Sequence, residues 1–302
     1  MTEDGLGQTL KWPEKTREIQ DSLMDSTRWN DFRFRDDDIV VATWSKSGTT
    51  WTQQIVSQLV FDGSDTVFGQ AESPWIDFQL APDAVKIADA QLHRRFMKTH
   101  LPLDALVFSR RAKYIYVGRD ARDVVWSYHH HLTHFSPLAF ERFGEVGRRT
   151  GVAPPPPVPA DIRAFYRGWL QNDAKAETSF WRNVQGWWDA RELPNVLLVH
   201  YARLKTDLPG EFRRIADFLG IAINEAKFPD MLRHCSLDHM KERASQFEFL
   251  EQMFEGGGRT FVNKGANGRW RDVLTPYEIA LCDEVAAQNL SADCATWLRT
   301  GD

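Results

Sequence analysis

Four short apolar runs along the chain, 38–44, 95–100, 113–118 and 195–201, predict strands that are buried on both faces. The first run passes through a Ser/Lys/Ser/Gly turn into the segment 49–61, where Trp51, Ile55 and Leu59 recur at helical spacing. A second amphipathic segment, 209–219, ends at Gly220, a typical helix stop. Strands that alternate with helices predict an α/β fold with a central parallel sheet flanked by helices on both faces.

The chain shows no repeat and no linker, so a single domain over residues 1–302 is expected. Residues 1–37 are polar and predict an irregular lead-in with one short helix. Four consecutive prolines at 154–157 predict a surface loop over 150–159, and the role of 153–159 is left open. The triplet at 256–258 predicts the start of a flexible stretch toward Lys264.

Composition excludes several broad classes of protein. The 302 residues are 42% hydrophobic and 26% charged, as in a globular protein, and the net charge of −5 argues against general binding to nucleic acid or to anionic membranes. Three cysteines without a CxxC pair, Cys235, Cys282 and Cys294, do not indicate a disulfide framework or a zinc ribbon. The acidic start has no apolar signal region, and no apolar run is long enough to span a bilayer. We therefore expect a cytoplasmic protein without a membrane partner.

The turn after the first strand has the chemistry of an anion site. The first backbone N–H groups of a helix are unpaired, and the helix dipole places partial positive charge there. Gly48 permits close backbone approach, Thr49 and Thr50 add hydroxyl donors, and Lys46 adds a mobile cation. The Walker A order is absent, because Lys46 precedes the glycine, which argues against a P-loop kinase. From spacing alone, a capped helix start with an incidental lysine remains an alternative.

Residues 46–51 read KSGTTW and resemble the 5′-phosphosulfate loop of the cytosolic sulfotransferase family, of the sulfotransferase 1 type, and we expect a bacterial member. This family uses 3′-phosphoadenosine 5′-phosphosulfate (PAPS) as sulfuryl donor and releases 3′-phosphoadenosine 5′-phosphate (PAP). Trp44 and Ser45 replace the Tyr-Pro pair that the family usually has. The resemblance implies a P-loop-like fold and cofactor contacts from the whole loop: Lys46, Ser47, Gly48, Thr49, Thr50 and Trp51.

Two further segments resemble the part of the family's site that holds the 3′-phosphate. Residues 119–128 place Arg119 at a strand end and Ser127 two turns into a helix, although exposed ion pairs at a helix start are the simpler reading from the residues alone. Residues 263–270 resemble the RKGxxGDW loop, with Asn263 in place of arginine and Arg269 in place of aspartate. We expect Asn263 to hold the phosphate weakly, and whether Arg269 substitutes is left open. The resemblance also implies cofactor contacts from Lys264 and Gly265, and that 256–302 closes the cofactor site.

Other positions carry over from the family one by one. Trp51 would stack on the adenine, and Tyr201 would bind its edge, although core packing explains Tyr201 equally well. Leu237 stands where the family has an aromatic residue, so that stacking contact is in doubt. The three residues that replace the family's Thr-Ser-Phe run near the cofactor are Cys235, Ser236 and Leu237.

The run 95–102 ends its strand at a histidine and resembles the family's catalytic segment. His is suited to removing a hydroxyl proton near neutral pH, and the resemblance selects His100 as general base among nine histidines. Adjacent His129, His130 and His131 on a helix favour a polar, partly exposed face over a metal site. The implied catalytic group is His100, Lys46, Lys98 and Ser127, with no metal.

The resemblance implies in-line sulfuryl transfer from PAPS to a hydroxyl, and the aromatic residues favour a small, aromatic or apolar acceptor. A non-catalytic nucleotide binder is the other reading, and a phenol, an alcohol, a sterol or a sugar all remain open as acceptors. Aromatic residues in 61–95, 129–160 and 240–262 are candidate acceptor walls: Phe68, Trp75, Phe78, Phe135, Phe247 and Phe249. The family's KxxxTVxxxE dimer motif is not matched, so a homodimer is possible without a sequence signal for it.

Overall fold

The computed structural model describes residues 11–153, 158–173 and 176–302, which contain one parallel four-stranded sheet in the order β2-β1-β3-β4. The strands are β1 (Ile39–Thr43), β2 (Phe96–Thr99), β3 (Lys113–Gly118) and β4 (Val196–His200). Because β1 has β2 on one side and β3 on the other, the winding reverses there, and a crevice forms at the carboxyl ends of these strands. The predicted α/β class is confirmed, with each strand within two residues of its predicted bounds.

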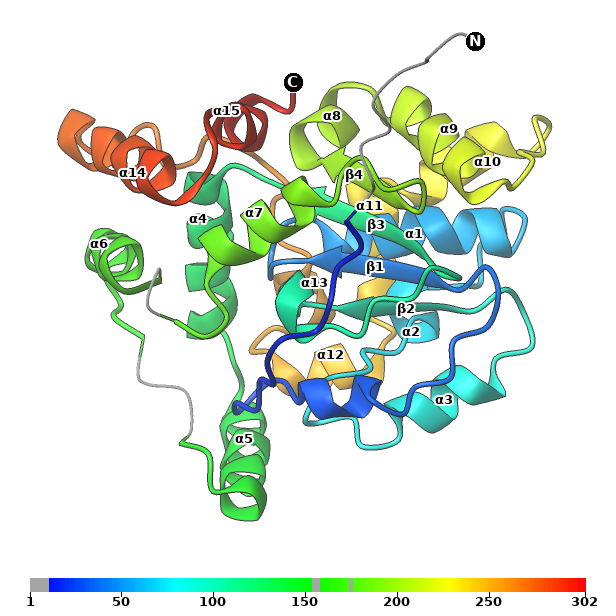
Figure 1. Cartoon of the computed structure of the whole chain (residues 1–302), viewed down its shortest axis with the longest axis horizontal. Helices are drawn as coiled ribbons and strands as arrows, with labels where there is room; N and C mark the ends of the chain where they lie inside the picture. The colour runs from blue at the N-terminus through cyan, green and yellow to red at the C-terminus, as the bar shows by residue number, and fades with distance from the viewer. Residues whose placement is uncertain (1–10, 154–157, 174–175) are drawn as a thin grey trace, which may run out of the picture.

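Helices surround the sheet on both faces (Figure 1), and their bounds show where the predicted segments begin and end. In chain order they are η1 (Ser26–Trp29), α1 (Thr49–Val60), α2 (Gly69–Glu72), α3 (Ala84–Ala90), η2 (Leu103–Ala105), α4 (Ala121–Thr133), α5 (Pro137–Thr150), α6 (Ile162–Asn172), α7 (Phe180–Asp189), α8 (Tyr201–Thr206), α9 (Leu208–Leu219), α10 (Phe228–His234), α11 (Leu237–Ala244), α12 (Glu248–Met253), α13 (Gly257–Phe261), α14 (Pro276–Asn289) and α15 (Ala292–Thr300).

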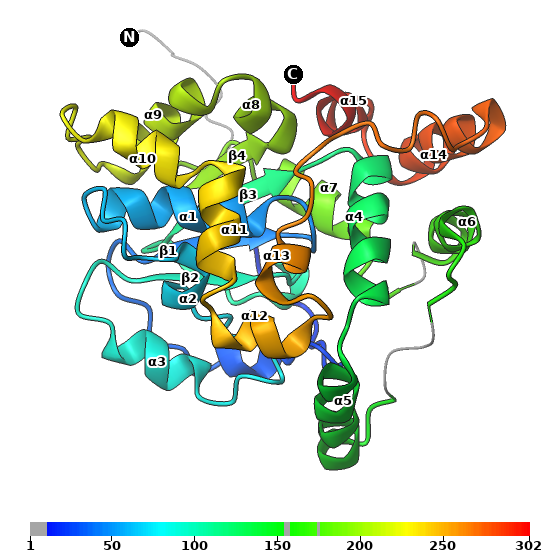
Figure 2. The same ribbon diagram turned by 180° about the vertical axis from the view of Figure 1, so that it is seen from behind.

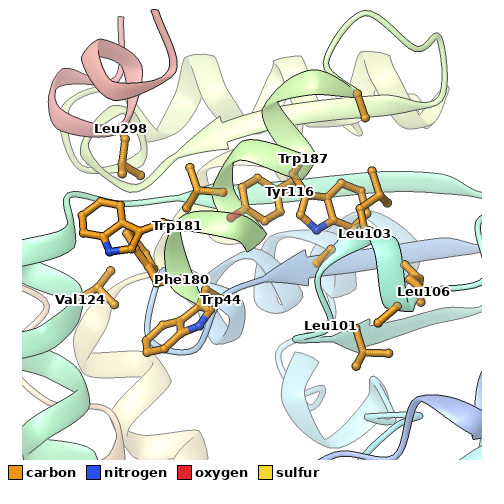
Figure 3. Close-up of a cluster of buried hydrophobic side chains, with 14 of the residues drawn as sticks. Trp44, Leu101, Leu103, Leu106, Tyr116, Val124, Phe180, Trp181, Trp187 and Leu298 are labelled. Atoms are coloured by element: carbon orange, nitrogen blue, oxygen red, sulfur yellow. The ribbon is translucent and has the colours of Figure 1, made fainter. Parts of the chain in front are cut away.

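Alternation along β1 divides the core into two layers. Val40 and Ala42 point to a cluster that includes α4 and α7, whereas Ile39 and Val41 point to a cluster that includes α1 and α9. In the first layer Trp187 of α7 stacks on a tyrosine of β3, as Figure 3 shows. Both faces of every strand are thus covered, and the polar groups gather at the strand ends.

A third apolar cluster forms a wall beside the sheet. Helices α11, α12 and α13 lie together in front of the strands in Figure 2, and α5 projects nearby. Their side chains pack into a small core that includes Phe143, Met240, Leu250 and Met253. This wall supplies part of the cavity described below.

The triplet at 256–258 is not the start of a flexible stretch, which corrects the prediction. Gly257 and Gly258 are buried and begin α13. A Cβ on Gly258 would lie 2.0 Å from the carbonyl oxygen of Ala244, so this glycine allows two helices to approach closely. The same residue type that indicates flexibility in an isolated sequence here permits tight packing.

The lead-in is largely irregular and contains the short helix η1, as predicted for the part from residue 11 onward. The four prolines at 154–157 lie outside the described residues. Across the ranges that the structure describes, no helix combines the length and the apolar character needed to cross a lipid bilayer.

Candidate active site

Each of the four strands delivers one predicted functional residue to the same cavity. Lys46 follows β1, His100 follows β2, Arg119 follows β3 and Tyr201 follows β4, and all four line a cavity of about 580 Å³. The carboxyl ends of parallel strands meet at one edge of a sheet, which brings together residues far apart in sequence. The cavity is of the size that holds a small-molecule ligand.

The loop after β1 presents backbone donors to this cavity. Gly48 is the N-cap residue of α1 and provides no side-chain cap, so the first N–H groups of the helix are free to bind an anion. Its φ of +127° favours glycine, and a Cβ would lie 2.9 Å from the Tyr201 ring. Lys46 also has a positive φ, +67°, which for a non-glycine residue is the kind of strain found at functional sites.

Two lysines, the partly exposed Lys46 and the buried Lys98, contribute positive charge to the cavity. Burial, with Lys98 and Arg119 nearby, lowers the pKa of Lys46 to about 7. Burial likewise lowers the pKa of Lys98 to about 8, and its Nζ lies 4.4 Å from the centre of the Trp75 ring. An anionic ligand would stabilise the charged form of both amines, so the site is electrostatically suited to a multiply charged anion.

His100 is held as a neutral base. Its Nδ1 donates to the carbonyl oxygen of Thr43 at 2.9 Å, so the ring proton sits on Nδ1 and Nε2 keeps a free lone pair. The same Nδ1 lies 3.0 Å from Thr43 Oγ1, which contacts Thr49 Oγ1 at 2.7 Å. Burial, followed by the charge of Lys98, lowers the pKa of His100 to about 3. The imidazole is therefore uncharged throughout the physiological range.

Arg119 is buried and joins the phosphate loop to the loop 263–269. Its guanidinium lies over the Tyr201 ring, 4.1 Å from the centroid, and donates to the carbonyl oxygen of Lys46 at 3.1 Å. Nε and Nη2 both donate to Asn267 Oδ1, at 3.1 and 2.9 Å. The simpler reading of this segment is a set of exposed ion pairs at a helix start. One such pair forms, between Arg122 and Asp120 at 2.8 Å, but both side chains are largely buried.

Most of the other predicted site residues line the cavity as well. They are Gly48, Thr49, Thr50, Trp51, Lys98, Ser127, Cys235, Ser236, Leu237, Asn263, Lys264 and Gly265. Ser47 is the exception: it is 1% exposed, does not belong to the lining, and its N–H donates to the Trp44 carbonyl oxygen. The turn that places Lys46 and Gly48 in the cavity lining buries Ser47 in the protein, so the geometry does not support the predicted contact of Ser47 with the cofactor.

Sequence reasoning missed the role of His131, which is partly exposed as predicted but faces the cavity and aromatic side chains instead of a polar surface. It lines the cavity, its Nδ1 is 3.5 Å from Lys46 Nζ, and its ring packs against Phe135, Phe254 and Phe261. Burial, followed by the charge of Lys46, lowers its pKa well below the usual value. The one sequence signal for His131 is its position four residues after Ser127 on α4, because residues at i and i+4 lie on one face of a helix.

A second missed residue is Asp77, a buried carboxylate behind the site. It accepts hydrogen bonds from Thr99 Oγ1 at 2.6 Å and from the indole N–H of Trp29 at 2.9 Å, and it also accepts one from Trp75. The Trp75 ring meets the His100 ring edge-on, 4.7 Å between centroids. Asp77 thus orients a residue that in turn packs against His100.

The far end of the same cavity is mainly apolar. Four of the six aromatic residues predicted as acceptor walls line it, namely Trp75, Phe78, Phe135 and Phe249. Phe68 and Phe247 instead belong to the packed core around α11 to α13. Residues 21–24 of the N-terminal lead-in also line the cavity, which the sequence did not indicate.

Fold and site together define an α/β protein with an anion site at the switch point of a parallel sheet, beside a neutral imidazole and an apolar chamber. Within the ranges described, no group of three or more His, Cys, Asp or Glu is arranged to hold a metal ion.

Comparison with known proteins identifies the family. The model of the sulfotransferase domain matches residues 36–293. A glycolipid sulfotransferase of Mycobacterium bovis is 34% identical over 316 residues, covering 96% of each chain. The luciferin sulfotransferase of Photinus pyralis is 33% identical, over 86% of this chain and 73% of that protein. The chain belongs to the sulfotransferase family and is an enzyme of the sulfuryl-transferring class.

Solved structures agree on the fold. A mouse sulfotransferase complexed with PAP superposes with a TM-score of 0.69 at 21% identity, covering 90% of this chain and 92% of that one. A retinol dehydratase bound to androsterone and PAP has a TM-score of 0.64 at 22% identity, over 88% and 84% of the two chains. The expected family and fold are therefore confirmed, whereas the roles of the individual site residues remain predictions.

Proposed function

We propose that this enzyme transfers the sulfuryl group of PAPS to a hydroxyl of a small apolar acceptor, with His100 as general base. His100 Nε2 takes the hydroxyl proton while the acceptor oxygen forms a bond to sulfur. The bond between sulfur and the bridging phosphate oxygen breaks, and its electron pair leaves with PAP. Lys46, Lys98 and the N-terminus of α1 stabilise the charge that develops on the transferring oxygens.

The observation that carries this proposal is the state of His100. A neutral imidazole whose Nδ1 proton is donated to the Thr43 carbonyl oxygen offers Nε2 as an acceptor in the cavity that Lys46 and Lys98 also line. Base, anion-binding lysines and apolar chamber meet in one space of about 580 Å³. Proton removal and charge stabilisation are the two requirements of this transfer.

PAPS suits the polar end as donor. Lys46 and the α1 N-terminus would bind its 5′-phosphosulfate, and Trp51 and Tyr201, whose rings meet at 69° with centroids 5.4 Å apart, would form an aromatic corner for adenine. PAP in two of the solved relatives supports the same donor.

The acceptor end suits a hydroxyl compound with a large apolar part. Its walls carry Leu23, Met24, Phe135, Phe249 and Met253, which would bury apolar surface of an acceptor. The glycolipid sulfotransferases that resemble the chain at 34% identity support an acceptor of this kind.

Calorimetric titration tests the donor. With EDTA present, PAP is expected to bind much more tightly than ATP does with Mg²⁺. A screen with PAPS then uses a phenol, a long-chain alcohol, a sterol and a glycolipid as acceptors, with PAP release as the readout. Tight binding of Mg·ATP and none of PAP would contradict the proposal.

A further inference from the structure

The hydrogen-bonding capacity of Arg119 is already engaged by the protein. Besides the two bonds to Asn267 Oδ1 and the bond to the Lys46 carbonyl oxygen, Nη2 donates to the Ala266 carbonyl oxygen at 3.3 Å. A guanidinium has five N–H donors in a fixed fork. Four contacts therefore occupy most of that fork, and Arg119 serves above all to fasten the loop 263–269 to the phosphate loop.

Arg269 lies in the same loop, near enough to Arg119 for the two charges to interact. It is half-buried, lines the cavity, and forms no side-chain hydrogen bond or ion pair with the residues that the structure describes. Gly268, with φ of +77°, turns the chain just before it, and its N–H donates to Asp123 Oδ1 at 2.6 Å. The turn is thus fixed, while the side chain after it keeps its donors.

The charge of Arg269 is close to that of Arg119. Burial lowers the pKa of Arg119, and the like charge of Arg269 acts in the same direction. Two neighbouring guanidinium groups repel each other unless an anion lies between them. Asn263 also lines the cavity, but it offers only a neutral amide.

We propose that Arg269 binds the 3′-phosphate of the donor nucleotide and supplies the charged contact that Asn263 cannot make. This inference rests on the proposed function, because it takes PAPS as the donor. Arg119 adds its charge and holds the loop. The guanidinium of Arg269 can donate two parallel hydrogen bonds to the phosphate oxygens. The arginine at position 269 thus compensates for the asparagine that replaces the family's arginine at position 263.

The test compares PAP with adenosine 5′-phosphate, which lacks only the 3′-phosphate. In Arg269→Gln, a charged hydrogen bond is lost, so the Kd for PAP is expected to rise about 10- to 100-fold. The Kd for adenosine 5′-phosphate is expected to stay within about twofold. Arg271→Gln is the matched control: that exposed arginine in the same loop lies over Trp270 and outside this cavity, and its loss is expected to spare both ligands.

Two more variants separate a direct contact from a loss of folding. Arg269→Lys is expected to bind PAP with intermediate affinity, because an ammonium makes a single point contact. The double variant Asn263→Arg/Arg269→Gln is expected to regain much of the PAP affinity, and thermal melts would verify that each variant folds. Wild-type PAP affinity in Arg269→Gln, or an equal loss for both nucleotides, would overturn the assignment. A wild-type enzyme that binds PAP no better than adenosine 5′-phosphate would instead overturn the proposed donor.

Discussion

The two ends of the cavity are built differently. The donor end is polar and comes from turns that directly follow β1, β3 and β4 and from the loop 263–269, which Arg119 fastens to the first of these turns, so the sheet fixes most of its geometry. The acceptor end is mostly aromatic and comes from the lead-in and from the segments around α5, α12 and α13. The hydrogen-bonded sheet edge fixes the anion site, whereas side-chain packing alone shapes the acceptor chamber. Substitutions at one end should therefore leave the other largely intact.

The largest effect is expected where the two ends meet. His100→Ala removes the proposed base, and kcat should fall about 10²- to 10⁴-fold. The Kd for PAP should change little, because His100 Nδ1 is bonded to Thr43 and makes no proposed contact with the nucleotide. Steady-state kinetics and calorimetry on the same preparation measure both quantities. Near-normal turnover in this variant would rule out His100 as the base.

The donor end should respond to pH through its lysines. The pKa values of about 7 for Lys46 and about 8 for Lys98 mean that both amines lose protons in the free enzyme as pH rises through this range. A bound anion raises both values, so binding of PAP takes up protons and weakens with pH. The Kd should rise by up to about tenfold per pH unit where one proton is taken up.

Calorimetry at pH 8 in two buffers of different ionisation enthalpy detects that proton uptake. Lys46→Arg, which stays charged, should show a flatter dependence on pH. Binding of PAP that is constant between pH 6 and pH 9 would contradict the assignment of the lysines.

The acceptor end should respond to the loss of aromatic area. Phe249→Ala removes part of the chamber wall, and KM for an apolar acceptor should rise about tenfold while the Kd for PAP is unchanged. Phe140→Ala is the matched control, since that side chain is 57% exposed and does not line the cavity. Equal effects of the two variants on KM would show that the chamber does not bind the acceptor.

The smallest expected effect tests the adenine contact. Leu237 lines the cavity beside Gly265. Because its side chain is 36% exposed, a larger ring can be accommodated there. Leu237→Phe would add an aromatic face, and PAP affinity should improve about 2- to 10-fold. Titration with PAP measures the gain, and weaker binding would indicate that position 237 does not face the adenine.

The same contrast between the ends explains what could be predicted from sequence. The strands and the turn at Lys46 and Gly48 could be predicted from contiguous runs in which an apolar pattern meets a polar turn, whereas Arg119 could be assigned only through the family resemblance. His131 and Asp77 could not, because the contact of His131 with Lys46 and the contacts of Asp77 with Thr99 and Trp29 join segments far apart in the chain. Gly258 was misread because close helix packing and flexibility use the same residue.

The most direct test of the central claim is the stoichiometry of transfer from PAPS in the presence of EDTA. The purified enzyme is incubated with PAPS and an acceptor from the screen, and PAP and sulfated product are quantified by mass spectrometry. Equal amounts of both, dependent on enzyme and acceptor, are the predicted result. The absence of a sulfated product from every acceptor class, with PAP binding intact, would contradict the account and indicate a nucleotide binder without transferase chemistry.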